Sequence, residues 1–306
     1  MRISPKQSRS AKKTWFSALV AVPVVAMLAG CAGGANEAAT GTEDDVIQIG
    51  VLGASDPFWD IYQEAAAAEG ISIELVDFAD YQQLNPSVTE GELDMNQFQH
   101  LVFLADYNVA SGSDLVPIGS TAIYPLGLYS TEYDDLEEIQ EGDTVAVPND
   151  STNLARALLL LQAEDLITLE GGGTNLSGLD DIDEENSKVT VTALEASLTA
   201  ASLTDVAAAV INNDFVEKAG LTFEGALAAD DPTDAAAFPY VNVFASRAED
   251  KDNETFLKLI EIFQTNQDVQ DSLVDVFGDS TVPLDATTAE LEDSLAGVTA
   301  DVEAAE

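Results

Sequence analysis

Arg156 stands out in the segment VAVPNDSTNLARALLLLQ (145–162), because the chain has 11 basic residues against 56 acidic ones. The segment predicts a helix from about Thr152 to Glu164, with this arginine in its first turn. The free N–H groups at a helix N-terminus already favour an anion, so a cation there requires a negative partner. A guanidinium binds a carboxylate through two parallel hydrogen bonds. The sequence allows two partners for Arg156: the carboxylate of a bound ligand, or an acidic side chain of the chain itself.

Residues that could carry catalysis are few. The chain has one cysteine, Cys31, and one histidine, His100, which excludes a cluster of histidines around a metal. The sequence contains no G-x-S-x-G turn, no P-loop and no H-E-x-x-H pair. We therefore expect a protein that is not an enzyme and that holds no metal or cofactor. A lipid-anchored hydrolase is the less favoured alternative.

The N-terminus has the organisation of an export signal. Residues 1–15 carry five basic residues and no acidic one, and residues 16–30 are mostly apolar. The ending LAGC resembles the lipobox of bacterial lipoproteins, in which the signal is cut before a cysteine that is then acylated. This predicts a signal peptide at 1–30, lipid such as palmitate on Cys31, and a flexible tether at 31–45. A single-pass anchor is the alternative, but a membrane span needs roughly 20 apolar residues.

The charge of the chain limits its partners. All 56 acidic residues but only 6 of the 11 basic ones follow residue 30. Such a surface repels nucleic acid, so we expect no nucleic-acid partner. Disorder would also need low hydrophobicity, whereas 46% of the residues are apolar. We expect a folded protein of a halophilic host, since the screening length falls to about 3 Å at 1 M salt.

Predicted strands and helices alternate along the chain, which favours α/β layers with largely parallel sheets. A short strand is also expected to end at Asn212. The other predicted strands cover residues 46–53, 71–78, 114–130, 143–148, 188–194 and 239–247. Helices are predicted at 57–70, 84–93, about 152–164, from 204 toward the strand at 212, and at 253–278. Between them lie a short apolar piece at 95–111 and an acidic, glycine-rich loop at 170–187.

Five segments of the chain, in this order, resemble one family. They are DYQQLNPSV (80–88), GELDMNQFQH (91–100), VAVPNDSTNLARALLLLQ (145–162), AAVIN (208–212) and PYVNV (239–243). Together with the lipobox they are similar to the methionine-binding lipoproteins (NlpA/MetQ family), which deliver substrate to ABC importers. The likeness extends over about residues 46–285.

The resemblance implies an α/β fold of the periplasmic-binding-protein type. Two lobes would be joined by two crossover strands, with the ligand in the cleft between them. Lobe I would comprise residues 46–123 plus 242–286, and lobe II residues 124–241. The acidic tail, 287–306, would be a frayed helix or disordered.

The resemblance also implies eight ligand-binding residues: Tyr81, Phe98, His100, Phe103, Asn153, Arg156, Asn212 and Asn242. Arg156 would bind the ligand's α-carboxylate, and the asparagines its amino or carboxylate group. The aromatic side chains would form a wall suited to a thioether. Phe103 stands where we expect tyrosine in much of the family, which keeps the wall but removes a hydroxyl.

The residues alone leave other roles open for these positions. Asn153 suits helix capping, and Asn212 and Asn242 suit turns. Phe98, His100 and Phe103 could be ordinary core. The order of the motifs favours the pocket in each case.

The predicted function is therefore that of a lipid-anchored receptor on the outer side of the cell membrane. It would capture L- or D-methionine or a close analogue and deliver it, as a monomer, to the permease and ATPase of an ABC importer. Binding of another small apolar amino acid is the alternative, because such ligands share the carboxylate clamp.

Overall fold

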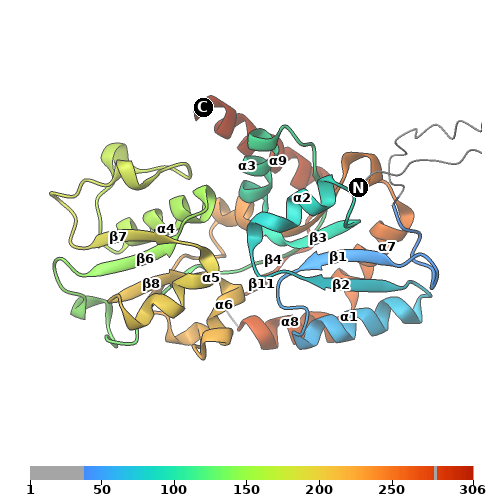
Figure 1. Cartoon of the computed structure of the whole chain (residues 1–306), viewed down its shortest axis with the longest axis horizontal. Coiled ribbons are helices and arrows are strands. Elements are labelled where there is room, and N and C mark those ends of the chain that lie inside the picture. The colour runs from blue at the N-terminus through green and yellow to red at the C-terminus, as the bar shows by residue number, and fades with distance from the viewer. Residues whose placement is uncertain (1–37, 279–280, 306) are drawn as a thin grey trace, which may run out of the picture. The chain divides into compact units, whose positions relative to one another are not determined.

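The computed structural model describes residues 38–278 and 281–305. The predicted signal peptide, Cys31 and the start of the predicted tether lie outside the described residues. Two β-sheets with flanking helices organise the rest of the chain (Figure 1). We call the part around the six-stranded sheet lobe I and the part around the five-stranded sheet lobe II.

The sheet of lobe I has the strand order β11-β4-β10-β3-β1-β2. Its strands are β1 (Ile47–Val51), β2 (Ile73–Asp77), β3 (Met95–His100), β4 (Val116–Ile123), β10 (Val241–Ser246) and β11 (Val282–Pro283). β1 pairs in parallel with β2 and β3, whereas β10 runs antiparallel between β3 and β4. β10, which comes late in the chain, therefore lies in the middle of the sheet, between two strands from the first part of the chain.

The sheet of lobe II has the order β7-β6-β8-β5-β9. Its strands are β5 (Gly127–Tyr129), β6 (Thr144–Pro148), β7 (Thr190–Leu194), β8 (Ala208–Ile211) and β9 (Ala228–Ala229). β6 is parallel to β7 and β8, and β5 is antiparallel to β8 and β9. The chain passes between the sheets at 124–126 and again at 230–240. The predicted two-lobed α/β fold with two crossovers is confirmed.

Helices cover both sheets. They are α1 (Pro57–Ala68), α2 (Leu84–Thr89), α3 (Leu101–Ser111), α4 (Ser151–Ala163), α5 (Ala196–Thr199), α6 (Asn213–Val216), α7 (Glu254–Thr265), α8 (Gln267–Phe277) and α9 (Thr288–Ala305). Side-chain caps start two of the helices over lobe I, since Asn253 and Asn266 accept backbone N–H groups of α7 and α8. α1, α7 and α8 pack together over an aromatic core that includes Phe58, Trp59 and Phe263.

A separate cluster of buried apolar side chains contains residues of both lobes. Lobe I contributes Leu52 and the aromatic residues at 81, 98 and 103, and lobe II contributes Ile211 and Phe215 among others. The lobes therefore meet through packed apolar side chains, which brings the ends of β3 and β8 close together.

Three predicted elements differ from the structure. The single strand at 114–130 is two strands, β4 and β5, which end and begin on either side of Pro125 and belong to different sheets. The apolar piece at 95–111 is strand β3 followed by helix α3. The short strand expected to end at Asn212 is β8 at 208–211, but the helix expected before it from residue 204 is wrong. Residues 205–207 form a turn, and burial in the middle of a sheet overrides the helical preference of the alanines that follow.

The tether prediction is wrong for residues 38–45. The backbone N–H of Ala39 donates to the Asp94 carboxylate at 2.9 Å, and the carbonyl of Gly41 accepts from Ser72 N–H at 2.8 Å. Gly41 is buried with φ +76°, and a Cβ there would come within 2.9 Å of Ile71. These small residues pack closely on lobe I, so the folded part includes Ala38.

The tail prediction is also wrong, because residues 288–305 form a packed helix. α9 lies beside α3, and its buried side chains are Leu291, Val298 and Val302 (Figure 1). Leu291 is fully buried among residues of lobe I such as Leu101 and Leu115. Within the described residues, no helix has the length and hydropathy needed to cross a membrane.

Replacement of Leu291 tests whether α9 is part of the fold. We expect Leu291→Ala to lower the free energy of unfolding by about 2–5 kcal/mol, as for other buried leucines. The control is Leu198→Ala, because Leu198 is 52% exposed; its effect should stay within about 0.5 kcal/mol. Urea unfolding followed by circular dichroism measures both. Equal, small effects would show that α9 contributes nothing to stability.

Candidate functional site

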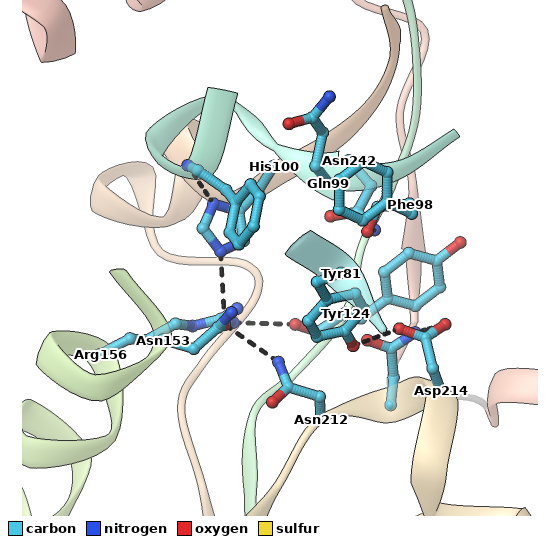
Figure 2. Close-up of a pocket in the computed structure, with 12 residues that line it drawn as sticks. Tyr81, Phe98, Gln99, His100, Tyr124, Asn153, Arg156, Asn212, Asp214 and Asn242 are labelled. Atoms are coloured by element: carbon cyan, nitrogen blue, oxygen red, sulfur yellow. Dashed lines mark hydrogen bonds between the residues drawn. The ribbon is translucent and has the colours of Figure 1, made fainter. Parts of the chain in front are cut away.

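A pocket lies where the two lobes meet. About 340 Å³ of space between its lining atoms, part of it open to solvent, is not filled by protein. Figure 2 shows its side chains converging from both lobes. The residues that line it are Tyr81, Phe98, Gln99, His100, Phe103, Tyr124, Asn153, Arg156, Asn212, Asn213, Asp214 and Asn242. All eight residues proposed from the sequence thus line this one pocket, while their contact with a ligand stays a prediction.

The guanidinium of Arg156 is held by an acidic side chain of the chain itself. Its Nε donates to Asp230 Oδ2 at 2.6 Å and its Nη2 donates to Asp230 Oδ1 at 3.1 Å. Asp230 is therefore the negative partner that the position of Arg156 requires. Among the described residues, Nη1 has no hydrogen-bond partner. The internal ion pair thus leaves one edge of the guanidinium available in the pocket.

Arg156 also connects both crossovers. Its Nη2 donates to the carbonyl of Tyr124 at 2.8 Å, and its Cζ lies 4.4 Å from the ring centroid of Tyr240. Asp230 Oδ1 in turn accepts from Leu126 N–H at 2.8 Å. One guanidinium on α4 therefore contacts both segments that join the lobes.

A chain of hydrogen bonds orients the amides of the pocket. Asp150, the N-cap of α4, accepts from both the backbone N–H and the Nδ2 of Asn153 at 2.9 Å. The hydrogen bond from Nδ2 to Asp150 fixes the orientation of the Asn153 amide, and its Oδ1 accepts from Asn212 Nδ2 at 2.9 Å. Asn212 Oδ1 is left buried and without a partner among the described residues. Asn153 is thus not the cap, and Asn212 makes no capping hydrogen bond of its own.

His100 is held as a neutral imidazole. Its Nδ1 accepts from the backbone N–H of Phe103 at 3.1 Å, so the ring proton sits on Nε2. Nε2 lies 3.4 Å from Asn153 Oδ1 and donates to it. Burial, and then the charge of Arg156, lower the pKa of His100 to about 3. The imidazole therefore serves as a neutral donor and as a wall of the pocket.

The aromatic side chains form the apolar wall. The rings of Tyr81 and Phe98 stack with centroids 5.7 Å apart, and Phe103 stands edge-on to Phe98 at 5.4 Å. These residues also belong to the cluster shared by the lobes, so core packing and pocket lining coincide. Asn242 lies within β10, not in a turn, and its Nδ2 donates to the Phe98 carbonyl at 3.2 Å.

Four lining residues were not predicted: Gln99, Tyr124, Asn213 and Asp214. Asp214 bears a charge and accepts from the Tyr81 hydroxyl at 2.6 Å (Figure 2). Asp214 lies two residues after Asn212, just beyond the end of β8. Its closeness in the sequence to a predicted site residue could have identified it. The partner of Arg156 was missed as well, since Asp230 is 74 residues away in the sequence.

A pocket between two α/β lobes, lined by a guanidinium, amides and aromatic rings, defines a small-molecule-binding protein of the substrate-binding type. The comparison with known proteins gives the particular family. The chain belongs to the NlpA lipoprotein family, whose model matches residues 47–284.

Relatives cover most of the chain. A protein of Pasteurella multocida (strain Pm70), named as a probable D-methionine-binding lipoprotein MetQ, is 34% identical over 269 residues, 86% of this chain and 96% of that protein. A substrate binding protein of a methionine transporter from Streptococcus pneumoniae superposes with TM-score 0.73 at 34% identity, covering 78% of this chain and 95% of that one. A nutrient binding protein from Burkholderia cenocepacia, solved bound to methionine, gives TM-score 0.72 at 35% identity, covering 78% and 99%. This membership sets the chain among substrate-binding proteins and not among enzymes.

The charge state of His100 can be tested directly, because it is the one histidine of the chain. In untagged, labelled protein, its NMR signal should show neutral imidazole from about pH 8 to about pH 5. In urea it should titrate near the ordinary value of 6.5. The unfolded state then binds a proton that the folded state does not, so this stabilising contribution is full above pH 6.5 and is lost as pH falls toward 3. A folded-state titration near 6.5 would contradict the assigned tautomer.

Proposed function

We propose that this chain captures methionine, or a close analogue, and delivers it to an ABC importer. The observation that carries the proposal is the Nη1 of Arg156, which has no hydrogen-bond partner among the described residues and belongs to a pocket that aromatic rings also line. Relatives in this family are named for methionine. Arg156 would bind the α-carboxylate through this edge. The aromatic rings would contact the thioether.

The donors of the pocket support this orientation of the ligand. Nη1 of Arg156 is the free cationic donor, since Asp230 and the Tyr124 carbonyl occupy Nε and Nη2. The Nδ2 groups of Asn153, Asn212 and Asn242 each make one hydrogen bond within the protein, and any donor that they have left is neutral. A carboxylate in the pocket would therefore be drawn to Arg156. A different small apolar amino acid would share this clamp and differ only in its fit to the aromatic wall.

The finer parts of the proposal concern the partners and the membrane. The permease and ATPase of an importer would receive the ligand from the two lobes. Acylated Cys31 would hold the protein on the outer side of the cell membrane. The family of lipoproteins to which the chain belongs and the lipobox at 28–31 support this attachment.

Replacement of Arg156 tests the carboxylate clamp. Arg156→Ala should weaken methionine binding by about 2–5 kcal/mol, or roughly 30-fold to several thousand-fold. Arg156→Lys should recover part of the affinity, because an ammonium keeps the charge but cannot bind Asp230 and a ligand in the same way. Calorimetry with methionine and with its decarboxylated analogue, 3-(methylthio)propylamine, measures the loss.

The test of Arg156 needs a control that the variants fold. Arg156→Ala leaves Asp230 without its cation, so ligand-free melting curves must show that each variant is folded at the titration temperature. In the wild type, removal of the ligand's carboxylate should cost about as much as removal of Arg156. Wild-type protein that binds methionine and the decarboxylated analogue equally well would falsify the clamp.

Replacement of Cys31 tests the lipid anchor. We expect Cys31→Ser to leave the precursor unprocessed or to release the folded domain into the medium, because one sulfur carries the attachment. Methionine affinity should be unchanged, since Cys31 precedes the folded residues. Fractionation of cells with an antibody against the domain measures the location. Processing and membrane retention equal to wild type would mean that something other than Cys31 anchors the protein.

A further inference from the structure

We propose that Asp214 binds the ammonium group of the captured amino acid, and that the site therefore selects ligands with a cation next to the carboxylate. The assignment rests on the proposed function. It adds to Arg156 a second charged contact from the opposite side of the pocket (Figure 2).

The two hydrogen-bond donors that contact the Asp214 carboxylate are both neutral. The Tyr81 hydroxyl donates to its Oδ2 at 2.6 Å, and Asn213 Nδ2 donates to its Oδ1 at 3.3 Å. In the part of the chain that the structure describes, none of the ion pairs includes Asp214. Lys218 acts on it only from a distance. The carboxylate of Asp214 thus lines the pocket without a cation beside it.

A desolvated carboxylate of this kind favours a cationic ligand group. Asp214 is partly buried, and loss of hydration raises the pKa of its carboxyl above the usual value. An uncompensated charge in such surroundings is costly, and an ammonium placed against it removes much of that cost. The desolvated carboxylate of Asp214 is therefore a physical reason for a ligand to carry a positive charge at this position.

A second acceptor lies in the same turn. Asn212 Oδ1 is buried and unpaired among the described residues, and the hydrogen-bond chain from Asp150 through Asn153 fixes the amide in that orientation. An ammonium group has three N–H donors, so it can satisfy more than one acceptor. The turn at 212–214 presents acceptors, whereas α4 presents the Nη1 donor of Arg156. This separation of donors and acceptors fits a zwitterion.

The competing role for Asp214 is a latch between the lobes. Tyr81 belongs to lobe I and Asp214 to lobe II, so their hydrogen bond joins the lobes whatever the ligand is. A latch would affect all ligands of the closed site equally. Contact with the ammonium would affect only ligands that carry one.

The experiment compares two ligands and three proteins by calorimetry. The ligands are L-methionine and 4-(methylthio)butanoate, which is methionine without its ammonium group. The proteins are wild type, Asp214→Asn and the matched control Glu217→Gln. Glu217 is exposed, three residues from Asp214, and outside the pocket, so its replacement removes the same charge from the same region.

We expect wild type to prefer methionine by roughly 30-fold or more, the size expected for a buried charge pair. Asp214→Asn should lose most of that preference through weaker methionine binding, with butanoate binding little changed. Glu217→Gln should behave as wild type. Ligand-free melting curves check that the variants fold.

Four results would overturn the assignment. Equal losses for both ligands in Asp214→Asn mean a latch. Unchanged methionine affinity in that variant means no contact. If wild type binds the two ligands equally well, there is no ammonium contact, whatever the variants do. The proposed capture of methionine would still stand in that case. Wild type that binds neither ligand overturns the proposed function, and this assignment with it.

Discussion

The contact between Arg156 and Asp230 is the interaction on which the arrangement of the site depends. Asp230 lies at the start of the second crossover, and it also binds the first crossover through Leu126 N–H. Arg156 adds the start of α4 to the same junction and reaches the carbonyl of Tyr124. A guanidinium can do this because its donors lie in a fixed fork, so two edges can bind the protein while a third faces the pocket.

The orientation of the amides depends on a second buried carboxylate. Asp150 caps α4 and takes the Nδ2 of Asn153, which forces Asn153 to offer its oxygen to Asn212 and to His100. Each member of the chain therefore determines which atom the next one presents. Helix capping, the orientation of the amides and the acceptor that His100 Nε2 finds are consequences of one local network.

Periodic patterns in the sequence predict the alternation of strands and helices, because they are local. The resemblance to the family implied the two crossovers and eight of the residues that line the pocket. The sequence missed what depends on distant neighbours. Asp230 is one of 56 acidic residues, and only the fold brings it to Arg156. The sequence predicts a short strand that ends at Asn212 but extends a helix too far toward it, because the alanines of β8 carry no strand signal until they are buried. The tail did contain a signal, since Leu291, Val298 and Val302 have helical spacing, but its acidic composition favoured disorder.

The two arginines in the described part of the chain are both used inside the protein. Arg156 joins the crossovers, and Arg247 donates to the carbonyls of Val88 and Leu93 while pairing with Asp250. Most of the acidic surface therefore has no basic partner, and the field of the protein is strongly negative. An amino acid zwitterion has no net charge, so this field acts on it weakly at long range. On the proposed function, capture would then depend on the local separation of charge within the pocket, where Arg156 and the acceptors at 212–214 belong to different elements, α4 and the start of α6.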